Sequence, residues 1–286
     1  SLLDAYGASS AGLHALNENY LYTVEALQDF LADVAPGGYL GISRWIRLPP
    51  RDTLKLFATA VQALQAHGSD APGSQLVLIR GWQTSTLLIK NGQFSVAEIA
   101  DLREFCTARA FDLAWYPGMQ ATKANRFNIL ARPYFFDAAT ALAGAEAADF
   151  IARYKFDITP ATDDRPYFAH FFKWAVLPEI LALRGQGGLP LLESGYLVLV
   201  ATLLQAALIS VIFILLPLAV LHRGRQTTPA ATISRSRVLL YFFAIGLAFL
   251  FVEIAFMQKF ILFLHHPLYA VATVLAAFLV FAGLGS

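Results

Sequence analysis

The feature that most constrains this chain is an uncharged apolar run at residues 195–221. Its length of about 27 residues exceeds the roughly 20 that a helix needs to cross the hydrocarbon core of a bilayer. Two more apolar runs follow at residues 238–264 and 267–285. Only 14% of all residues are charged, well below the roughly 25% typical of soluble domains. The pattern therefore predicts three transmembrane helices, with a lipid bilayer as partner.

The first 166 residues differ, because short strand patterns alternate there with amphipathic helix patterns. Helices are expected at residues 17–34, from Asp52 to a stop at Gly68, and after the capping box of Ser95 and Glu98; strands are expected at residues 39–45, 75–80, 85–90 and 111–115. Alternating strands and helices predict a mostly parallel sheet with helices on both faces. The strand–turn–strand at residues 75–90 adds an antiparallel member.

Residues 167–194 connect these two parts and are expected to form an interfacial helix and a linker. The stretch 167–183 is apolar but too short and too charged to span, so we expect Phe171, Phe172 and Trp174 to dip into the membrane surface. The chain thus divides into an α/β domain at 1–166, this connection, and an all-α membrane part at 195–286. Both ends read as cut, which predicts an internal piece of a larger protein.

Composition and motif spacing argue against several classes of function. The net charge of +1 gives no basis for a nucleic-acid partner. Cys106 is the single cysteine, so an intrachain disulfide is impossible. The six histidines have no metal-ligand spacing, and no metal site is expected.

Several segments carry a resemblance to a known family. They are Tyr20-Leu-Tyr-Thr-Val-Glu25, the Pro-Gly-Gly turn within residues 34–40, Phe111-Asp-Leu-Ala-Trp-Tyr-Pro-Gly118, Pro160-Ala-Thr-Asp-Asp-Arg-Pro-Tyr-Phe168, Glu253-Ile254 through Lys259, His266-Pro267 and the terminal Gly283-Leu-Gly-Ser286. The chain resembles the membrane-embedded spermidine-synthase-like proteins of bacteria, in the polyamine aminopropyltransferase superfamily. The resemblance covers nearly the whole chain and implies a partial Rossmann-like (class I methyltransferase-like) domain fused to helical spans. The Asp-Asp-Arg-Pro and Glu-Ile…Lys…His-Pro segments are its more specific parts.

The resemblance implies a transferase that moves an aminopropyl or methyl group to an amine or other small nucleophile. The donor would be S-adenosylmethionine or decarboxylated S-adenosylmethionine. The glycine-rich loop and the acidic residue that hold the donor in the family are not in this sequence; the resemblance implies that they lie in an upstream half of the protein. That half is therefore an expected partner, and this chain alone is expected to be inactive.

Asp4 is the candidate catalytic residue, as a base or as a ligand of the amine. It matches the first aspartate of the family's Asp-x-x-Asp-Pro stretch, but Gly7 occupies the second position and no proline follows. A polycationic amine needs paired carboxylates, so the missing one counts against a polyamine substrate. The simpler alternative is a loop aspartate that caps a turn.

Four residues are candidates for binding a small amine. Glu18 and Tyr22 are four apart on an expected helix and would share a face. Trp45 and Trp82 follow strands that are expected to end at the same edge of the sheet, where they would wall a pocket. The alternatives are a solvated helix face for the first pair and ordinary aromatic packing for the second.

The adjacent residues Asp163, Asp164 and Arg165 are expected to form a structural clasp. Two carboxylates beside an arginine favour a local ion pair over a metal site, which would need more oxygen ligands. We expect this clasp to join the α/β domain to the part of the chain that follows.

Glu253 is the charged residue of interest in the membrane part. Counted from Arg237, it lies roughly 24 Å along a helix that rises about 1.5 Å per residue. Lys259 is six residues on and does not share its face, so it is expected to extend toward the far membrane surface. Glu253 has either a transport or proton role or a hydrogen bond in helix packing. The first would make the chain a transporter-like polytopic protein with a degenerate, non-catalytic Rossmann-like regulatory domain.

Local charge and the resemblance predict opposite sides of the membrane for the α/β domain. The loop at residues 222–237 carries Arg223, Arg225, Arg235 and Arg237. By the positive-inside rule it would be cytoplasmic, which would place the α/β domain outside. The resemblance implies a cytosolic domain, and further upstream spans would override the local charge. We expect a multi-pass protein of the bacterial inner membrane with a cytosolic α/β domain.

Overall fold

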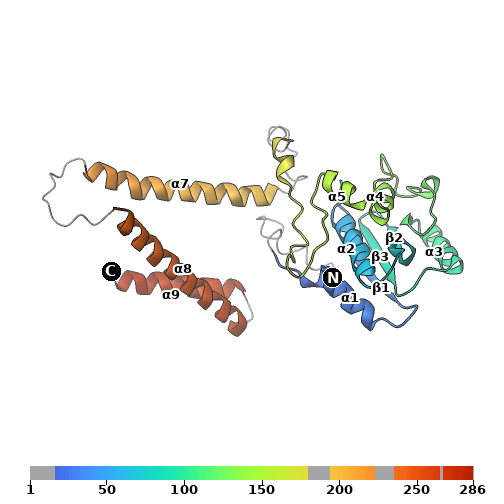
Figure 1. The fold of residues 1–286 in the computed structure, drawn as a ribbon, viewed down its shortest axis with the longest axis horizontal. Coiled ribbons are helices and arrows are strands. Elements are labelled where there is room, and N and C mark those ends of the chain that lie inside the picture. Colours follow the sequence, from blue (N-terminus) through green and yellow to red (C-terminus); the bar gives the residue numbers. More distant parts are fainter. Residues whose placement is uncertain (1–16, 180–193, 223–234, 265–266, 286) are drawn as a thin grey trace. The chain divides into compact units, whose positions relative to one another are not determined.

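The computed structural model describes residues 17–179, 194–222, 235–264 and 267–285 (Figure 1). The chain divides into two compact units, Ser1–Ile214 and Leu215–Ser286. Around the sheet of the first unit lie α1 (Val24–Asp33), α2 (Asp52–Ala66), α3 (Val96–Ala108), α4 (Tyr134–Ala143) and α5 (Ala147–Arg153). The strands are β1 (Tyr39–Trp45), β2 (Leu76–Arg80), β3 (Thr84–Lys90) and β4 (Asp112–Trp115). This part of the chain is a mixed α/β structure, as the sequence predicts.

The four strands form one sheet in the order β1-β3-β2-β4, and every neighbouring pair is antiparallel. The expectation of a mostly parallel sheet is therefore wrong. The hairpin of β2 and β3 was predicted, and its turn is closed by the Gly81 amide, which donates to the Thr84 carbonyl at 2.8 Å. The prediction of a mostly parallel sheet fails because β3 lies between β1 and β2 in the sheet. The turn folds β3 back along β2, and β3 then pairs with β1 on its other side. β1 and β2 still run in the same direction, but β3 separates them.

Helices cover both faces of the sheet, as expected. On one face α1, α2 and α4 bury a large apolar core that includes Leu27, Phe57 and Leu78. On the other face, residues of α3 pack against a smaller cluster around Val77 and Tyr116. Val77 and Leu78 belong to different clusters because successive side chains of a strand point to opposite faces.

The first helix starts later than the sequence pattern suggests. A 3₁₀ turn covers Tyr20–Tyr22, and α1 begins after Thr23, whose hydroxyl accepts the Ala26 amide at 3.2 Å. Leu21 is consequently 57% exposed and does not belong to the helix, which was predicted for residues 17–34. The capping box of Ser95 and Glu98 on α3 is confirmed.

The segment after α5 belongs to the protein core, not to a membrane surface. Phe171 is 1% exposed and Phe172 7% exposed, so the prediction that both dip into lipid is wrong. Lys173 anchors the segment, because its Nζ donates to the carbonyls of Ile151 at 2.7 Å and Tyr154 at 3.0 Å at the end of α5. Of the predicted interfacial helix, the part beyond residue 179 lies outside the described residues.

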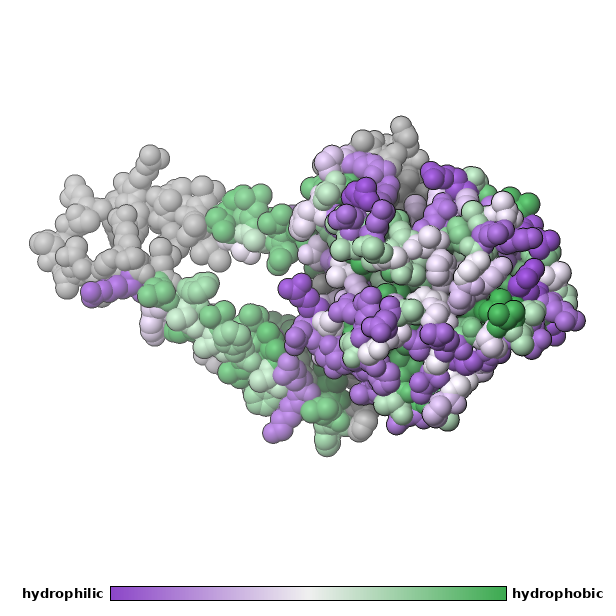
Figure 2. Space-filling view, turned by 45° about the vertical axis from the view of Figure 1, so that its right-hand side comes forward, coloured by the Kyte–Doolittle hydropathy of each residue, from purple (hydrophilic) through white to green (hydrophobic). Residues whose placement is uncertain are grey.

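Three long apolar helices follow, at the positions that the sequence predicts. They are α7 (Ser194–His222), α8 (Arg235–Leu264) and α9 (Pro267–Leu284). Within the described residues, one helix is long and apolar enough to cross a membrane, over Leu240–Leu264; the apolar stretches Leu199–Phe213 and Tyr269–Leu284 are shorter. Figure 2 shows hydrophobic residues gathered on the apolar helices, whereas hydrophilic residues are spread over the α/β part.

The burial of Phe171 gives a test of the boundary between core and membrane surface. Phe171→Ala is expected to lower the free energy of unfolding of the α/β part by about 3–5 kcal/mol, as for other buried aromatic rings. Trp174 is 59% exposed, so Trp174→Ala should cost less than about 1 kcal/mol. Pulse proteolysis of the full chain in detergent across a denaturant series measures both. If both variants lowered the free energy of unfolding by equally small amounts, the result would contradict the burial of Phe171 in the core and would place it at the membrane surface.

Candidate functional site

The described residues bring two distant segments together into an acidic-aromatic surface, made of Glu18, Tyr20, Glu25, Asp163 and Tyr167. The Tyr20 hydroxyl donates to Glu18 Oε2 at 3.3 Å and the Tyr167 hydroxyl to Glu18 Oε1 at 3.5 Å. Glu25 Oε2 accepts the Asp163 amide at 3.0 Å. Each of the two glutamates is thus held in place by a neighbour.

Backbone hydrogen bonds hold the two segments side by side. The Asn19 amide donates to the Pro166 carbonyl at 2.7 Å, and the Val24 amide donates to the Ala161 carbonyl at 2.8 Å. Between these two bonds the chain makes a tight turn, closed by the Arg165 amide on the Thr162 carbonyl at 2.9 Å. The surface is therefore built on fixed backbone and not on flexible side chains alone.

The proposed clasp of Asp163, Asp164 and Arg165 occupies this turn, and all three residues are exposed. The contacts that tie the turn to the domain come from its backbone and from Glu25. Among the described residues, the structure records no ion pair between the three side chains. The main chain of this turn, and not its charged side chains, therefore joins it to the domain. The charge pattern of the sequence does not predict such backbone contacts.

The charge of this surface is negative. The Glu18 carboxylate, followed by burial and the hydrogen bond to Glu18, raises the pKa of Tyr20, and Asp163 adds to the effect. A field that raises the pKa of a tyrosine favours a cation at the same place. Beneath the surface the Arg44 guanidinium lies 4.2 Å from the centre of the Tyr22 ring and 4.7 Å from that of Phe168.

The four candidate amine-binding residues do not form one site. Glu18 is exposed, but Tyr22 is 3% exposed and packs in the core, since α1 begins only after Tyr22 and the two do not share a helical face. Trp45 pairs with Thr84 across the sheet, so Trp45 and Trp82 lie at the same end of the sheet, as predicted. Trp82 is 76% exposed and does not wall a pocket. Asp4 and Gly7 lie outside the described residues.

Glu253 lies on the face of α8 that packs against α9. Phe249 and Phe256, one helical turn to either side of it, both pack edge-on against Phe278; their ring centres lie 5.1 Å and 5.9 Å from that of Phe278. Glu253 itself is partly buried, whereas Lys259 is exposed. The two charges thus lie on different faces of α8, as predicted, and the neighbour of Glu253 is α9.

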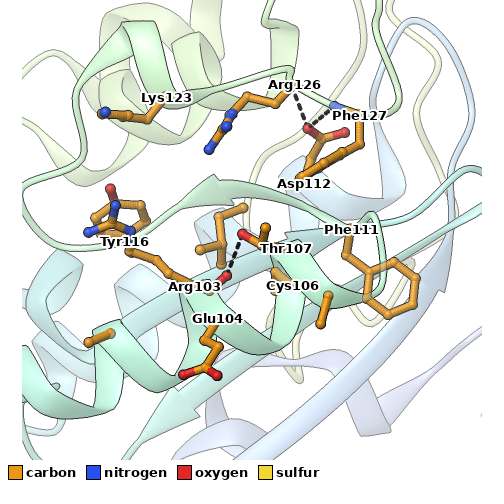
Figure 3. A pocket seen from close by; sticks show the side chains of 13 residues that line it. Arg103, Glu104, Cys106, Thr107, Phe111, Asp112, Tyr116, Lys123, Arg126 and Phe127 are labelled. Carbon is orange, nitrogen blue, oxygen red and sulfur yellow. Dashed lines mark hydrogen bonds between the residues drawn. The ribbon is translucent and has the colours of Figure 1, made fainter.

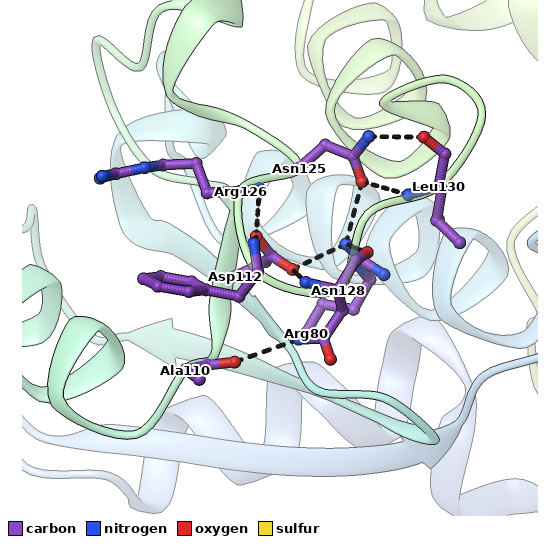
Figure 4. A network of polar contacts seen from close by, with 8 residues as sticks. Arg80, Ala110, Asp112, Asn125, Arg126, Asn128 and Leu130 are labelled. Atoms are coloured by element: carbon purple, nitrogen blue, oxygen red, sulfur yellow. Dashed lines mark hydrogen bonds and ion pairs between the residues drawn. The ribbon is translucent and has the colours of Figure 1, made fainter.

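A buried ion pair is the polar site that sequence reasoning missed. Arg80 is 3% exposed and Asp112 2% exposed, and their Nη2 and Oδ2 atoms are 2.8 Å apart. Asp112 also accepts the backbone amides of Arg126, Phe127 and Asn128 at 2.6, 2.9 and 2.7 Å (Figure 4). The only sequence signal is a lone charge at the end of β2 and another at the start of β4.

This network is structural and has no spare capacity for a substrate. Burial alone would raise the pKa of Asp112, but the three amide donors and Arg80 outweigh burial and hold that pKa below its usual value. Arg80 also donates to the carbonyl oxygen of Asn128 at 2.6 Å. The carboxylate therefore fixes the loop of residues 125–130 against the edge of the sheet.

No protein-family model, no curated protein and no solved structure matches this chain. The resemblance to spermidine-synthase-like proteins therefore stays an expectation.

The buried pair predicts a specific loss of stability. Asp112→Asn leaves the Arg80 guanidinium buried without a compensating charge, with an expected cost of about 3–5 kcal/mol. Asp101 is exposed, so the matched change Asp101→Asn should cost less than about 0.5 kcal/mol. Because the folded pKa of Asp112 is lowered, its contribution is present above the unfolded value of about 4 and is lost as the pH falls through the folded pKa.

Thermal unfolding of the full chain between pH 7 and pH 2 measures both effects. The wild type should lose more stability on acidification than Asp112→Asn, since the variant no longer has the carboxylate that titrates. An Asp112→Asn chain as stable as the wild type at pH 7 would contradict the assigned role.

Proposed function

We propose that this chain belongs to a membrane-bound, spermidine-synthase-like transferase, which moves an aminopropyl or methyl group from an S-adenosyl donor to an amine or other small nucleophile. The observation that carries the proposal is the acidic-aromatic surface. It begins at Glu18, directly after the segment that contains Asp4. The candidate base and the candidate amine surface are therefore neighbours in sequence.

The chemistry of the surface suits a protonated amine. Carboxylates attract an ammonium group, and tyrosine rings add a cation–π attraction. The two hydrogen bonds to Glu18, at 3.3 and 3.5 Å, are long, so its oxygens keep capacity for a further donor. Glu25, held by the Asp163 amide, provides a second carboxylate on the same surface. It would replace the second aspartate of the family's motif, whose position is occupied by Gly7.

The described residues contain no glycine-rich loop for the donor, and the resemblance assigns that loop to an upstream half. When bound there, the donor supplies an electrophilic carbon on its sulfonium sulfur. The proposed role of this chain is to bind the amine, to orient it, and to accept its proton on the Asp4 carboxylate. Orientation of this kind is a large source of rate acceleration in group transfer.

The proposal predicts that Glu18 controls binding of a dication. Glu18→Gln should weaken binding of 1,4-diaminobutane to the full chain in detergent by about tenfold, because one charge-assisted contact is lost. Glu146 is also exposed but lies outside the acidic-aromatic surface, so Glu146→Gln is the matched control and should leave affinity unchanged. Isothermal titration calorimetry gives both values. If both variants weakened binding of 1,4-diaminobutane equally, the effect would come from the overall charge of the protein, and the proposed role of Glu18 would be contradicted.

Glu253 favours a second candidate function. Glu253 lies on the α8 face that packs against α9, between rings that contact Phe278 edge-on. An ionisable residue within an apolar helix, at a contact between helices, is typical of a functional site in a membrane protein. This placement supports a transporter-like polytopic protein in which the α/β part is regulatory. The two candidate functions differ in the membrane sidedness that they allow. The transferase requires the α/β part to be in the cytosol, because S-adenosyl donors are cytosolic, whereas the transporter-like protein does not.

Sidedness is tested with a single accessible cysteine. Gly73 is a poor site, because a Cβ there would lie 3.2 Å from Ala143 Cβ; Ala71 is exposed and is preferred. Ala71→Cys in a Cys106→Ser background, in the full-length protein, is treated in intact cells with a membrane-impermeant maleimide. Labelling only after lysis is expected for a transferase with a cytosolic domain. Labelling of intact cells would exclude the transferase and favour the transporter-like protein.

A further inference from the structure

A hollow of about 470 Å³ lies between α3 and the loop that follows β4 (Figure 3). We call it the cationic pocket, and define it by Arg103, Tyr116, Lys123, Arg126 and Phe127, together with Phe111. Its volume is within the range of about 300–1,000 Å³ that is usual for small-molecule sites. It shares no residue with the acidic-aromatic surface.

Three cations line the cationic pocket, one from α3 and two from the loop. Among the described residues, the side chains of Arg103, Lys123 and Arg126 form no ion pair. In Figure 3 the Arg126 guanidinium extends toward the hollow. Glu104 also lines the hollow and is the carboxylate there besides Asp112. Three like charges around one hollow repel one another unless an anion lies between them.

The other titratable groups at the pocket do not cancel this charge. The Asp112 carboxylate is already paired with Arg80 and with backbone amides. Burial, with a smaller effect of Asp112, raises the pKa of the Cys106 thiol to about 11, so the thiol stays neutral. Glu104 is then one carboxylate against the three cations, so the net charge that a ligand meets is positive.

The walls of the pocket are fixed before a ligand arrives. Asp112 holds the backbone of Arg126 and Phe127. At the other wall, α3 is secured at its start by the capping box and by the ion pair of Glu98 with Lys90 at 2.6 Å. Binding to a prearranged site costs less ordering entropy than binding to mobile loops.

Aromatic rings give the pocket a second property. Tyr116 is 9% exposed, and Phe111 and Phe127 are 36% and 39% exposed, so flat apolar surface lies beside the cations. The Arg126 guanidinium carbon is 5.6 Å from the centre of the Phe127 ring. A ligand that uses both properties carries an anionic group and a flat ring.

We propose that the cationic pocket binds a phosphorylated small molecule with a flat heterocycle, of the class of a mononucleotide. The phosphate lies among Arg103, Lys123 and Arg126, which match its charge and its acceptor oxygens. The heterocycle lies against the rings of Tyr116 and Phe127. Because the proposed amine surface is elsewhere on the domain, this inference does not depend on the proposed function.

The test uses the full chain in detergent and adenosine monophosphate as probe, with inorganic phosphate and adenosine as its two halves. Adenosine monophosphate should bind more tightly than either half. Arg126→Gln should weaken it about tenfold, the usual loss for one charged contact. Phe127→Ala should weaken adenosine monophosphate but not inorganic phosphate.

Arg109→Gln is the matched control, since Arg109 is exposed at the end of α3, stacks on Phe105 at 4.1 Å and lies outside the pocket. It should leave affinity unchanged, and thermal unfolding confirms that each variant is folded. Equal weakening by Arg109→Gln and Arg126→Gln, or no binding by the wild type at millimolar probe, would overturn the proposal. Adenosine monophosphate that binds no more tightly than phosphate would overturn the heterocycle part. Displacement by phosphatidylglycerol vesicles but not by phosphatidylcholine vesicles would instead assign the phosphate to a lipid headgroup.

Discussion

The ion pair of Arg80 and Asp112 is the buried contact that joins the sheet to the loop after β4. Two charges buried this deeply are tolerable only when the attraction and the hydrogen bonds replace the lost hydration. The pair joins the end of β2 to the start of β4, next to the register shift between Leu78 and Ile79. The same carboxylate holds the loop that forms one wall of the cationic pocket. The ion pair thus lies beside the register shift between β2 and β4 and also fixes one wall of the cationic pocket.

The domain carries two functional candidates of opposite charge, and both are built in the same way. In each, an irregular segment is fixed by backbone hydrogen bonds, and exposed charged side chains extend from it. Pro166 and Ala161 accept amides at the acidic-aromatic surface, and Asp112 accepts amides at the cationic pocket. Loops that are secured in this manner can present charges at defined positions, as binding sites require.

Sequence patterns predicted the parts of the fold that depend on local periodicity. The extent of α2, the capping box at Ser95 and the four strands follow from spacing and cap chemistry alone. Sheet direction did not, because the pairing of β3 with β1 is decided by tertiary contacts that no local pattern encodes. Phe171 was misplaced for a related reason: an aromatic cluster has the same sequence signature in a core as at a membrane surface.

The candidate sites were predictable only in part. Glu18 is recognisable as an exposed carboxylate, but its contact with Tyr167 joins residues 149 apart. The cationic pocket depends on a loop whose path is fixed by Asp112, which reads in sequence as an ordinary strand residue. Spacing can indicate which residue types are available, whereas their convergence is set by long-range backbone contacts.

The strand order also has a consequence for synthesis on the ribosome. Tyr39 of β1 pairs with Lys90 of β3, about fifty residues later, so β1 must wait for its partner while β2 and β3 can pair as a hairpin as soon as both emerge. An exposed strand with unpaired amides is prone to wrong pairing. We therefore expect the nascent chain to be most vulnerable between the emergence of β1 and that of β3, before any apolar helix is made.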